Sequence, residues 1–183
     1  SKCRPDLEKH PGAHWFNLLE IQQKTFSDEI IEDLALENKL VSKYSKILAS
    51  AKIEFDGKTN NLSQMGVYSQ NVSRVIRERA ARSVEEFLIS VEDEINEIYE
   101  QLVQVRTKIA KKLGYDNYVK LGYARLQRTD YDSEMVSEYR RQVYDSLVPL
   151  CGELINKQME RINVTDPKFY DLNLNFLDGN PTP

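Results

Sequence analysis

The sequence predicts a mainly all-α protein, an antiparallel helical lobe of about five helices with at most a short strand or hairpin near residues 53–62. Three observations predict this fold class. Apolar residues recur at intervals of three and four over several long segments, which is the period of an amphipathic helix. Helix-capping residues stand before these segments, and Gly114 follows one of them. Only Ile53-Glu54-Phe55, followed by Asp56-Gly57, has the pattern of a strand that enters a turn.

Both ends of the chain are expected to lack regular secondary structure. Pro11 and Gly12 interrupt any early helix, so residues 1–25 are expected to form an irregular lead-in. Within it, the apolar run that begins at Trp15 fits either a buried strand or a helical turn, because its periodicity does not decide between them. The apolar residues of 163–183 follow no helical pattern, which predicts an extended tail.

Five helices are expected between these ends. Ser27 can cap the first helix, which has acidic residues in its positive first turn. Asp132 or Ser133 can cap the fifth helix. Pro149 lies inside the fifth helix and predicts a kink or a break there, because proline lacks the backbone N–H. The expected ranges are about 28–50, 72–89, 92–113, 117–126 and 133–161.

Length and charge are typical of one domain without a nucleic-acid partner. The 183 residues, with a formal net charge of −4, are expected to form a single helical domain over 1–183. The mild acidity argues against binding to nucleic acid or to an anionic membrane. No apolar run reaches the roughly 18 residues of a membrane span. The two distant cysteines, Cys3 and Cys151, are typical of reduced thiols, which favours a cytoplasmic location.

The two histidines do not form a recognisable metal site. His10 and His14 are spaced like a zinc pair on a helix, but Pro11 and Gly12 lie between them and no Glu follows His10. The expected helices contain no histidine, which argues against a di-iron centre in a helical bundle. No nucleophile motif and no glycine-rich phosphate loop occur. The chain is therefore expected to hold no catalytic, cofactor-binding or metal-binding residue of its own.

Two charged clusters have ordinary explanations. The arginines of the second helix are expected on an exposed face, with Glu78 and Arg82 spaced as an i,i+4 pair. The acidic cluster is expected to be a solvated helix start that the helix dipole favours, with a cation site as the alternative. The basic run comprises Arg74, Arg77, Arg79 and Arg82, and the acidic cluster comprises Glu92, Asp93, Glu94, Glu97 and Glu100.

One segment has the composition of a binding surface. Tyrosine and arginine combine apolar area with polar ends, and they recur where proteins contact ligands and partners. Two interpretations stay open. The segment contacts a ligand or a neighbouring lobe, or its rings pack in the core while its arginines cap helices or pair with Asp130 and Asp132. The residues concerned are Tyr115, Tyr118, Tyr123, Arg125, Arg128 and Tyr131.

The same region resembles a known family. Its motif is Tyr99-x-x-Leu102-Val103-x-Val105-Arg106-x-x-Ile109-Ala110-Lys111-Lys112-Leu113-Gly114-Tyr115, then Asn117-Tyr118-x-x-Leu121-Gly122-Tyr123, then Arg125, Arg128, Asp130 and Tyr131. This order and spacing resemble oligoendopeptidase F, in the thimet oligopeptidase-like group of zinc metallopeptidases. The similarity runs from about His10 to Pro183 and includes Thr25-Phe26-Ser27, Asn61-Leu62-Ser63-Gln64 and Gly179-Asn180-Pro181.

The resemblance implies a helical, two-lobed enzyme with a deep channel. In such an enzyme, zinc held by a His-Glu-x-x-His helix and a further Glu activates water for the hydrolysis of short, unfolded peptides. No His-Glu-x-x-His occurs in this sequence, and in the family it lies downstream of the matched region. The resemblance therefore implies a fragment of the pre-catalytic lobe that is inactive by itself, with zinc only in the full-length parent. Tyr123, Arg125, Arg128 and Tyr131 are then expected at the substrate channel or the lobe interface.

A different class of function stays open. The heptad-like faces of the third and fifth helices also fit a free-standing helical module that binds other proteins. A lobe separated from its partner would expose apolar surface, so self-association of the isolated chain is expected.

Overall fold

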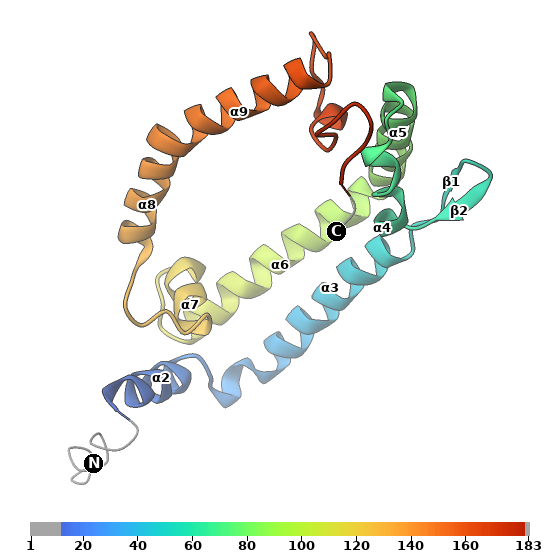
Figure 1. Ribbon diagram of the computed structural model, residues 1–183. Helices are drawn as coiled ribbons and strands as arrows, with labels where there is room; N and C mark the ends of the chain where they lie inside the picture. The colour runs from blue at the N-terminus through green and yellow to red at the C-terminus, as the bar shows by residue number, and fades with distance from the viewer. Residues whose placement is uncertain (1–11, 182–183) are drawn as a thin grey trace. The chain divides into compact units, whose positions relative to one another are not determined.

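The computed structural model describes residues 12–181 (Figure 1). It is mainly all-α, with one two-stranded antiparallel hairpin among these residues, and this confirms the predicted fold class. The chain divides into two compact units: unit 1 comprises Ser1–Val41 and Tyr99–Arg141, and unit 2 comprises Ser42–Ile98 and Gln142–Pro183. The single domain expected over 1–183 stays a prediction, because two compact units can belong to one domain.

Two helical segments of unit 1 begin where the sequence supplies a cap. The Ser27 hydroxyl accepts a hydrogen bond from the Glu29 backbone N–H at 3.3 Å, and the Asn117 side chain accepts one from Val119 at 2.9 Å. Unit 1 holds α2 (Ala13–Lys24), the 3₁₀ turn Asp28–Ile30, the first part of α3 (Ile31–Ala49), the later part of α6 (Glu92–Lys112), α7 (Tyr118–Arg125) and most of α8 (Ser133–Gln142).

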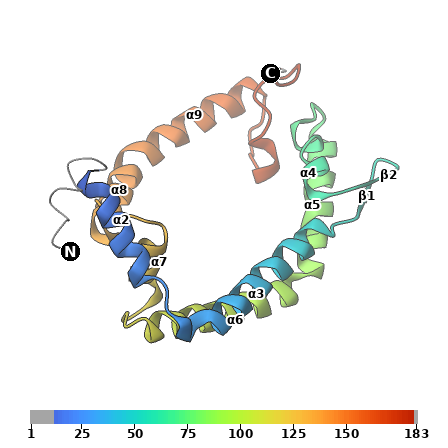
Figure 2. The ribbon, with the colours of Figure 1, turned by 90° about the horizontal axis from the view of Figure 1, so that it is seen from below.

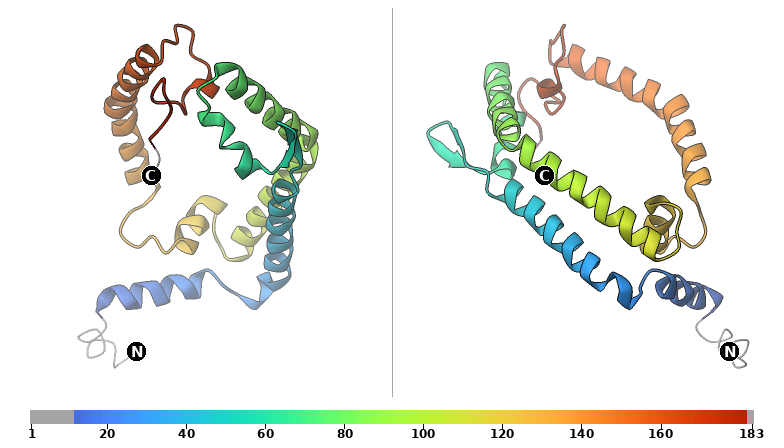
Figure 3. Two further views of the ribbon diagram at one scale, coloured as in Figure 1. Left: turned by 45° about the vertical axis from the view of Figure 1, so that its right-hand side comes forward. Right: turned by 180° about the vertical axis from the view of Figure 1, so that it is seen from behind.

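Helices α3 and α6 run antiparallel and side by side (Figures 1 and 3). Their facing sides in unit 1 are joined by the buried Asp33, which pairs with Lys108 at 2.8 Å and Lys112 at 2.7 Å. Hydrogen bonds from these two lysines lower the pKa of Asp33, although burial alone would raise it. The buried apolar side chains of unit 1 are Ile30, Leu40, Val105, Ile109, Ala110 and Leu121.

Glycine ends α6, as the sequence predicts. Gly114 has a φ of +80°, a left-handed conformation that glycine adopts without strain. The next backbone N–H, from Tyr115, donates to the Ala110 carbonyl at 2.9 Å and closes the helix end. The chain then turns into α7, which packs against α2 (Figure 2).

Unit 2 contains the hairpin, which packs against α4 and α5 (Figure 3). Both turn residues, Asp56 and Gly57, have positive φ, at 53° and 71°. Positive φ at both positions is the requirement of a type I′ hairpin turn, which Asp-Gly favours, so this turn follows from the local sequence. The strands are β1 (Ile53–Phe55) and β2 (Lys58–Asn60), and the helices that follow are α4 (Leu62–Met65), the 3₁₀ turn Tyr68–Gln70 and α5 (Arg74–Ser90).

Unit 2 has two buried apolar clusters, of which one lies at the hairpin and the other comprises Met159, Ile162 and Leu174. Ile53, Phe55, Met65 and Ala80 are buried together, and half-buried side chains surround them. The Phe55 and Tyr68 rings meet edge to face, with centroids 4.8 Å apart. These surrounding side chains are Leu62, Tyr68, Ile76, Val84 and Phe87.

The predicted interruption near Pro149 is confirmed. The fifth expected helix is divided into α8, a π-helical stretch Val143–Leu147, and α9 (Val148–Arg161), with Pro149 in the first turn of α9. The Val148 N–H donates to the Val143 carbonyl, five residues back. Since Pro149 has no N–H and its ring clashes with the carbonyl four residues earlier, the wider turn relieves that conflict.

Three expectations about the chain ends are wrong. The lead-in expected over 1–25 contains the helix α2, which starts directly after Gly12. His14 therefore lies in a helix, contrary to the expectation that no helix holds a histidine, whereas His10 lies outside the described residues. The tail expected to be extended over 163–183 contains a 3₁₀ turn, Phe169–Asp171.

Apolar residues at helical spacing over the expected helix 72–89, namely Val72, Ile76, Ala80 and Leu88, are not all buried. Ala80 is buried and Ile76 is half-buried, as expected from the helical period. However, Val72 and Leu88 are 55% and 41% exposed. Helical spacing identifies residues on one face but does not say how far a neighbouring element extends along that face.

Candidate functional site

The tyrosine- and arginine-rich segment forms a defined local structure at the end of α7. Gln127 has a φ of +54°, and the Arg128 N–H donates to the Tyr123 carbonyl at 3.1 Å. This is a Schellman-type helix end with a residue other than glycine in the left-handed position. As a result, the chain reverses directly after α7 and brings Arg128 back onto the ring of Tyr123.

Arg128 contacts two aromatic rings. Its guanidinium carbon lies 4.5 Å from the centroid of Tyr123 and 5.5 Å from that of Tyr131. The two rings are themselves in edge contact, with centroids 6.4 Å apart and planes at 75°. Such cation–π contacts orient a guanidinium while its N–H groups stay available. We call Tyr123, Arg128 and Tyr131 the tyrosine–arginine clamp.

The clamp forms one side of a pocket in unit 1. The pocket has a volume of about 410 Å³, within the usual range of small-molecule sites. Tyr123, Arg128 and Tyr131 therefore come together, as the sequence-based site prediction requires. The other residues that line it are Ile21, Val119, Lys120, Ala124, Asp132, Ser133 and Glu134.

Arg125, the fourth predicted site residue, does not line this pocket. Its guanidinium donates to the Glu37 carboxylate at 2.9 Å and 3.3 Å. Arg106 donates to the same carboxylate at 2.7 Å. Burial would raise the pKa of Glu37, but hydrogen bonds from Arg125 and Arg106 outweigh burial and lower it. Arg125 thus joins α7 to α3 inside unit 1, by a pairing that differs from the expected pairing with Asp130 or Asp132.

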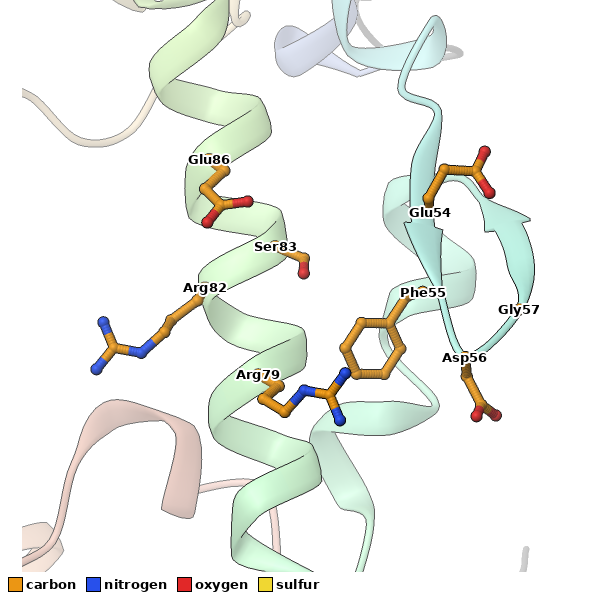
Figure 4. Close-up of a pocket in the computed structure, with 8 residues that line it drawn as sticks. All are labelled: Glu54, Phe55, Asp56, Gly57, Arg79, Arg82, Ser83 and Glu86. Atoms are coloured by element: carbon orange, nitrogen blue, oxygen red, sulfur yellow. The ribbon is translucent and has the colours of Figure 1, made fainter.

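A second pocket lies in unit 2, between the hairpin and α5 (Figure 4). It has a volume of about 400 Å³. Figure 4 shows Arg79 and Ser83 directed toward the hairpin and Arg82 on the other side of the helix. The Arg79 guanidinium carbon lies 5.6 Å from the Phe55 ring centroid. Arg82 pairs with Glu78 at 2.7 Å, which confirms the predicted i,i+4 pair.

The expectation that all four arginines of α5 share an exposed face is wrong for Arg77. Its side chain is 2% exposed, and it pairs at 2.7 Å with the fully buried Asp171. Arg74 reaches the same carboxylate at 2.9 Å. Asp171 comes from the tail, 94 positions after Arg77, so local sequence contains no signal for this contact. The pair fastens the 3₁₀ turn Phe169–Asp171 onto α5.

The acidic residues at the start of α6 are exposed, as predicted for a solvated helix start. Residues 12–181 contain no group of three or more His, Cys, Asp and Glu side chains that could hold a metal ion. His14 Nδ1 lies 3.5 Å from the Thr129 hydroxyl. Within the same residues, no helix is both long enough and apolar enough to span a membrane.

Three solved structures are similar to the chain. It is 49% identical to a provisionally assigned oligoendopeptidase F from Bacillus anthracis str. Ames, over 100% of this chain and 34% of that one, with a TM-score of 0.93. It is 46% identical to another provisionally assigned oligoendopeptidase F, over 100% of this chain and 32% of that one, with a TM-score of 0.97. It is 47% identical to PZ peptidase A with an inhibitor, over 98% of this chain and 32% of that one, with a TM-score of 0.95.

The resemblance to oligoendopeptidase F is confirmed. The two oligoendopeptidase F structures match the whole of this chain at 49% and 46% identity. PZ peptidase A matches 98% of it at 47% identity. The oligoendopeptidase F-like chain spans about a third of the length of each of these proteins. No family model and no curated protein matches it.

Proposed function

We propose that this oligoendopeptidase F-like chain is part of a zinc-dependent oligopeptidase that hydrolyses short, unfolded peptides. The observation that carries the proposal is similarity over the whole chain, at 46% identity or more, to solved oligoendopeptidase F structures. In this proposal the chain contributes to the wall of the substrate channel. The enzyme of which it is part acts in the cytoplasm, and fractionation of cells tests that location.

The residues of this chain do not fit the zinc of such an enzyme. The sequence holds two histidines and no His-Glu-x-x-His. Its described residues offer no cluster of three metal-ligating side chains. We therefore assign no step of hydrolysis to a residue of this chain, and we expect the isolated chain to be inactive.

A peptidase assay tests this proposal. The purified 183-residue chain and the full-length protein are compared on a quenched fluorogenic peptide, with zinc content measured in both. We expect turnover and stoichiometric zinc only in the full-length protein. Turnover by the isolated chain with bound zinc would contradict the assignment, and so would a full-length protein that cleaves no peptide.

Of the four predicted site residues, the three of the clamp are better candidates than Arg125 for contact with a peptide at the channel wall. Arg125 is neutralised by Glu37, whereas Tyr123, Arg128 and Tyr131 line a pocket. In the full-length enzyme, Arg128→Ala should raise KM or lower kcat without lowering the melting temperature. Unchanged kinetics with a lower melting temperature would instead assign these residues to packing.

A second candidate function is a helical module that binds proteins or a second copy of itself. The observation that favours it is the apolar side of α9, where Leu150 and Leu154 are 50% and 55% exposed one turn apart. Sedimentation of the chain over a range of concentrations tests self-association. Leu150→Lys with Leu154→Lys should abolish it, whereas Val75→Lys, at an apolar position on α5 that is 64% exposed, should not. A monomer at every concentration would count against this candidate.

A further inference from the structure

We propose that the tyrosine–arginine clamp binds a carboxylate, namely the C-terminal carboxylate of a short peptide with an apolar last residue. The peptide part of this proposal rests on the proposed function. The carboxylate part rests on the charge, geometry and lining of the pocket in unit 1.

The guanidinium of Arg128 is held in place before any ligand arrives. It is half-buried and contacts the Tyr123 and Tyr131 rings at 4.5 Å and 5.5 Å. The helix end that closes on the Tyr123 carbonyl fixes its backbone. A guanidinium oriented in this way loses little rotational freedom when a planar anion binds, and its parallel N–H groups match the two oxygens of a carboxylate.

Arg128 also lacks the buried carboxylate partner that Arg77, Arg106 and Arg125 have. Arg125 and Arg106 share Glu37, and Arg77 pairs with Asp171. No carboxylate in residues 12–181 forms an ion pair with Arg128. Asp132, which lines the same pocket, instead accepts the backbone N–H groups of Glu134 and Met135 at 3.0 Å each and caps α8. The guanidinium is thus an oriented cation in a pocket, with two aromatic contacts but no anionic partner among the described residues.

The remaining lining selects the kind of anion. Lys120, which pairs with Asp116 at 3.2 Å, and Arg128 are the positive residues of the lining, and Asp132 and Glu134 are the negative ones, so the pocket as a whole carries no excess of positive charge. A phosphate or another polyanion would meet repulsion from these two carboxylates. A single carboxylate on an otherwise neutral molecule avoids most of that repulsion, and its attached chain can place an N–H group toward Glu134.

The apolar part of the pocket identifies the side chain of the ligand. Ile21, Val119 and Ala124 line it beside the tyrosine rings, and they come from α2 and α7. A pocket of about 410 Å³ has room for one amino-acid residue and part of the preceding residue. An apolar C-terminal residue therefore fits these walls while its carboxylate reaches Arg128.

Calorimetry on the 183-residue chain tests the proposal directly. The probes are an N-acetylated tripeptide ending in leucine, the same tripeptide as its C-terminal amide, acetate and inorganic phosphate. Because a hydrogen bond to a charged group is lost in the amide, the acid should bind at least about tenfold more tightly. Acetate should bind more weakly than the tripeptide acid, since it lacks the apolar side chain.

Two arginine variants locate the binding. Arg128→Gln should remove the preference for the acid, and Arg128→Lys should keep part of it, because the charge remains but the planar pair of donors is lost. Arg79→Gln is the matched control, since Arg79 also stacks on an aromatic ring but lines a pocket in unit 2, and it should keep the full preference. Melting curves of each variant establish that it is folded.

Four outcomes would overturn the inference. These are equal binding of acid and amide, a preference that survives Arg128→Gln in a folded protein, tighter binding of phosphate than of the acid, and acetate binding as tightly as the tripeptide. Calorimetry needs no turnover, so its result is independent of the peptidase assay on the full-length protein. A chain that prefers the acid, from an enzyme that cleaves no peptide, would keep the carboxylate site and remove only the peptidase assignment.

Discussion

Replacing Asp171 by asparagine should destabilise unit 2 far more than a substitution of similar size on its surface. Asp171 is fully buried, and its carboxylate accepts hydrogen bonds from Arg77 at 2.7 Å and from Arg74 at 2.9 Å. Arg77 is itself only 2% exposed. Asn keeps the shape of the side chain but leaves the buried guanidinium of Arg77 without its counter-charge.

The pKa of Asp171 gives the size of the effect. Burial would raise it, but hydrogen bonds from Arg74, the Lys168 backbone N–H and Arg77 outweigh burial and lower it from 3.8 to about 2. A lowering of this size corresponds to roughly 2–3 kcal/mol of stability near neutral pH. Removal of one partner from a buried ion pair typically costs about 3–5 kcal/mol, so we expect a loss of about 2–5 kcal/mol.

The sign of the pH dependence follows from the lowered pKa. Because the carboxylate binds a proton more weakly in the folded state, its contribution is complete above about pH 4. It is then lost as the pH falls through about 2. Asp171→Asn cannot bind this proton, so its unfolding free energy should fall less over the same range than that of the unsubstituted chain.

Urea unfolding followed by far-UV circular dichroism, at about pH 7 and across the acid range, measures both effects. Glu78→Gln is the matched control, because it breaks the exposed pair with Arg82 and should cost less than about 1 kcal/mol. If Asp171→Asn lost no more stability than Glu78→Gln, or if both proteins lost stability equally in acid, the reasoning about this pair would be refuted.

Three further changes test unit 1 by the same unfolding measurement. Glu37→Gln should cost about 1–3 kcal/mol, because two guanidinium groups lose their shared carboxylate; a cost no larger than that of an exposed pair would contradict this role. Ile109→Ala should cost about 2–5 kcal/mol, since its side chain is fully buried, and an unchanged midpoint would show that the site collapses without a cavity. Gly114→Ala should cost about 1–2 kcal/mol through its positive φ alone, because no atom lies within 4 Å of the added methyl group; an increase in stability would rule out that strain.

Local sequence was sufficient to predict most of the helices. Helices α3, α5, α6 and α7 and the division of the last long helix lie within about three residues of the predicted positions, because periodicity, caps and Pro149 are all local signals. Helix α2 was missed because Pro11 and Gly12 were interpreted as a feature of the whole lead-in. Gly12, with a φ of +82°, instead marks only the boundary at which a helix begins.

Burial was harder to predict than helix position. Leu150 and Leu154 stand at helical spacing in α9, yet they are half exposed or more. Their spacing describes a property of one helix, whereas burial requires a second surface to cover it. The C-terminal tail shows the opposite case, a charged residue that is buried. Asp171 is charged and would be expected in solvent, but it is fully buried because two arginines from α5 neutralise it.

The same reasoning explains why the candidate site was only partly predictable. Arg125 and Arg128 lie three positions apart in the same tyrosine- and arginine-rich segment, so sequence alone predicts a ligand contact equally for both. What separates them is Glu37, 88 positions before Arg125, which neutralises Arg125 and leaves Arg128 against two rings. In a chain with many arginines, those that find a buried carboxylate hold the fold together. Arg128 is oriented by two rings, has no carboxylate partner among the described residues and lines a pocket with apolar walls, and for these three reasons together the proposed carboxylate site is placed at Arg128.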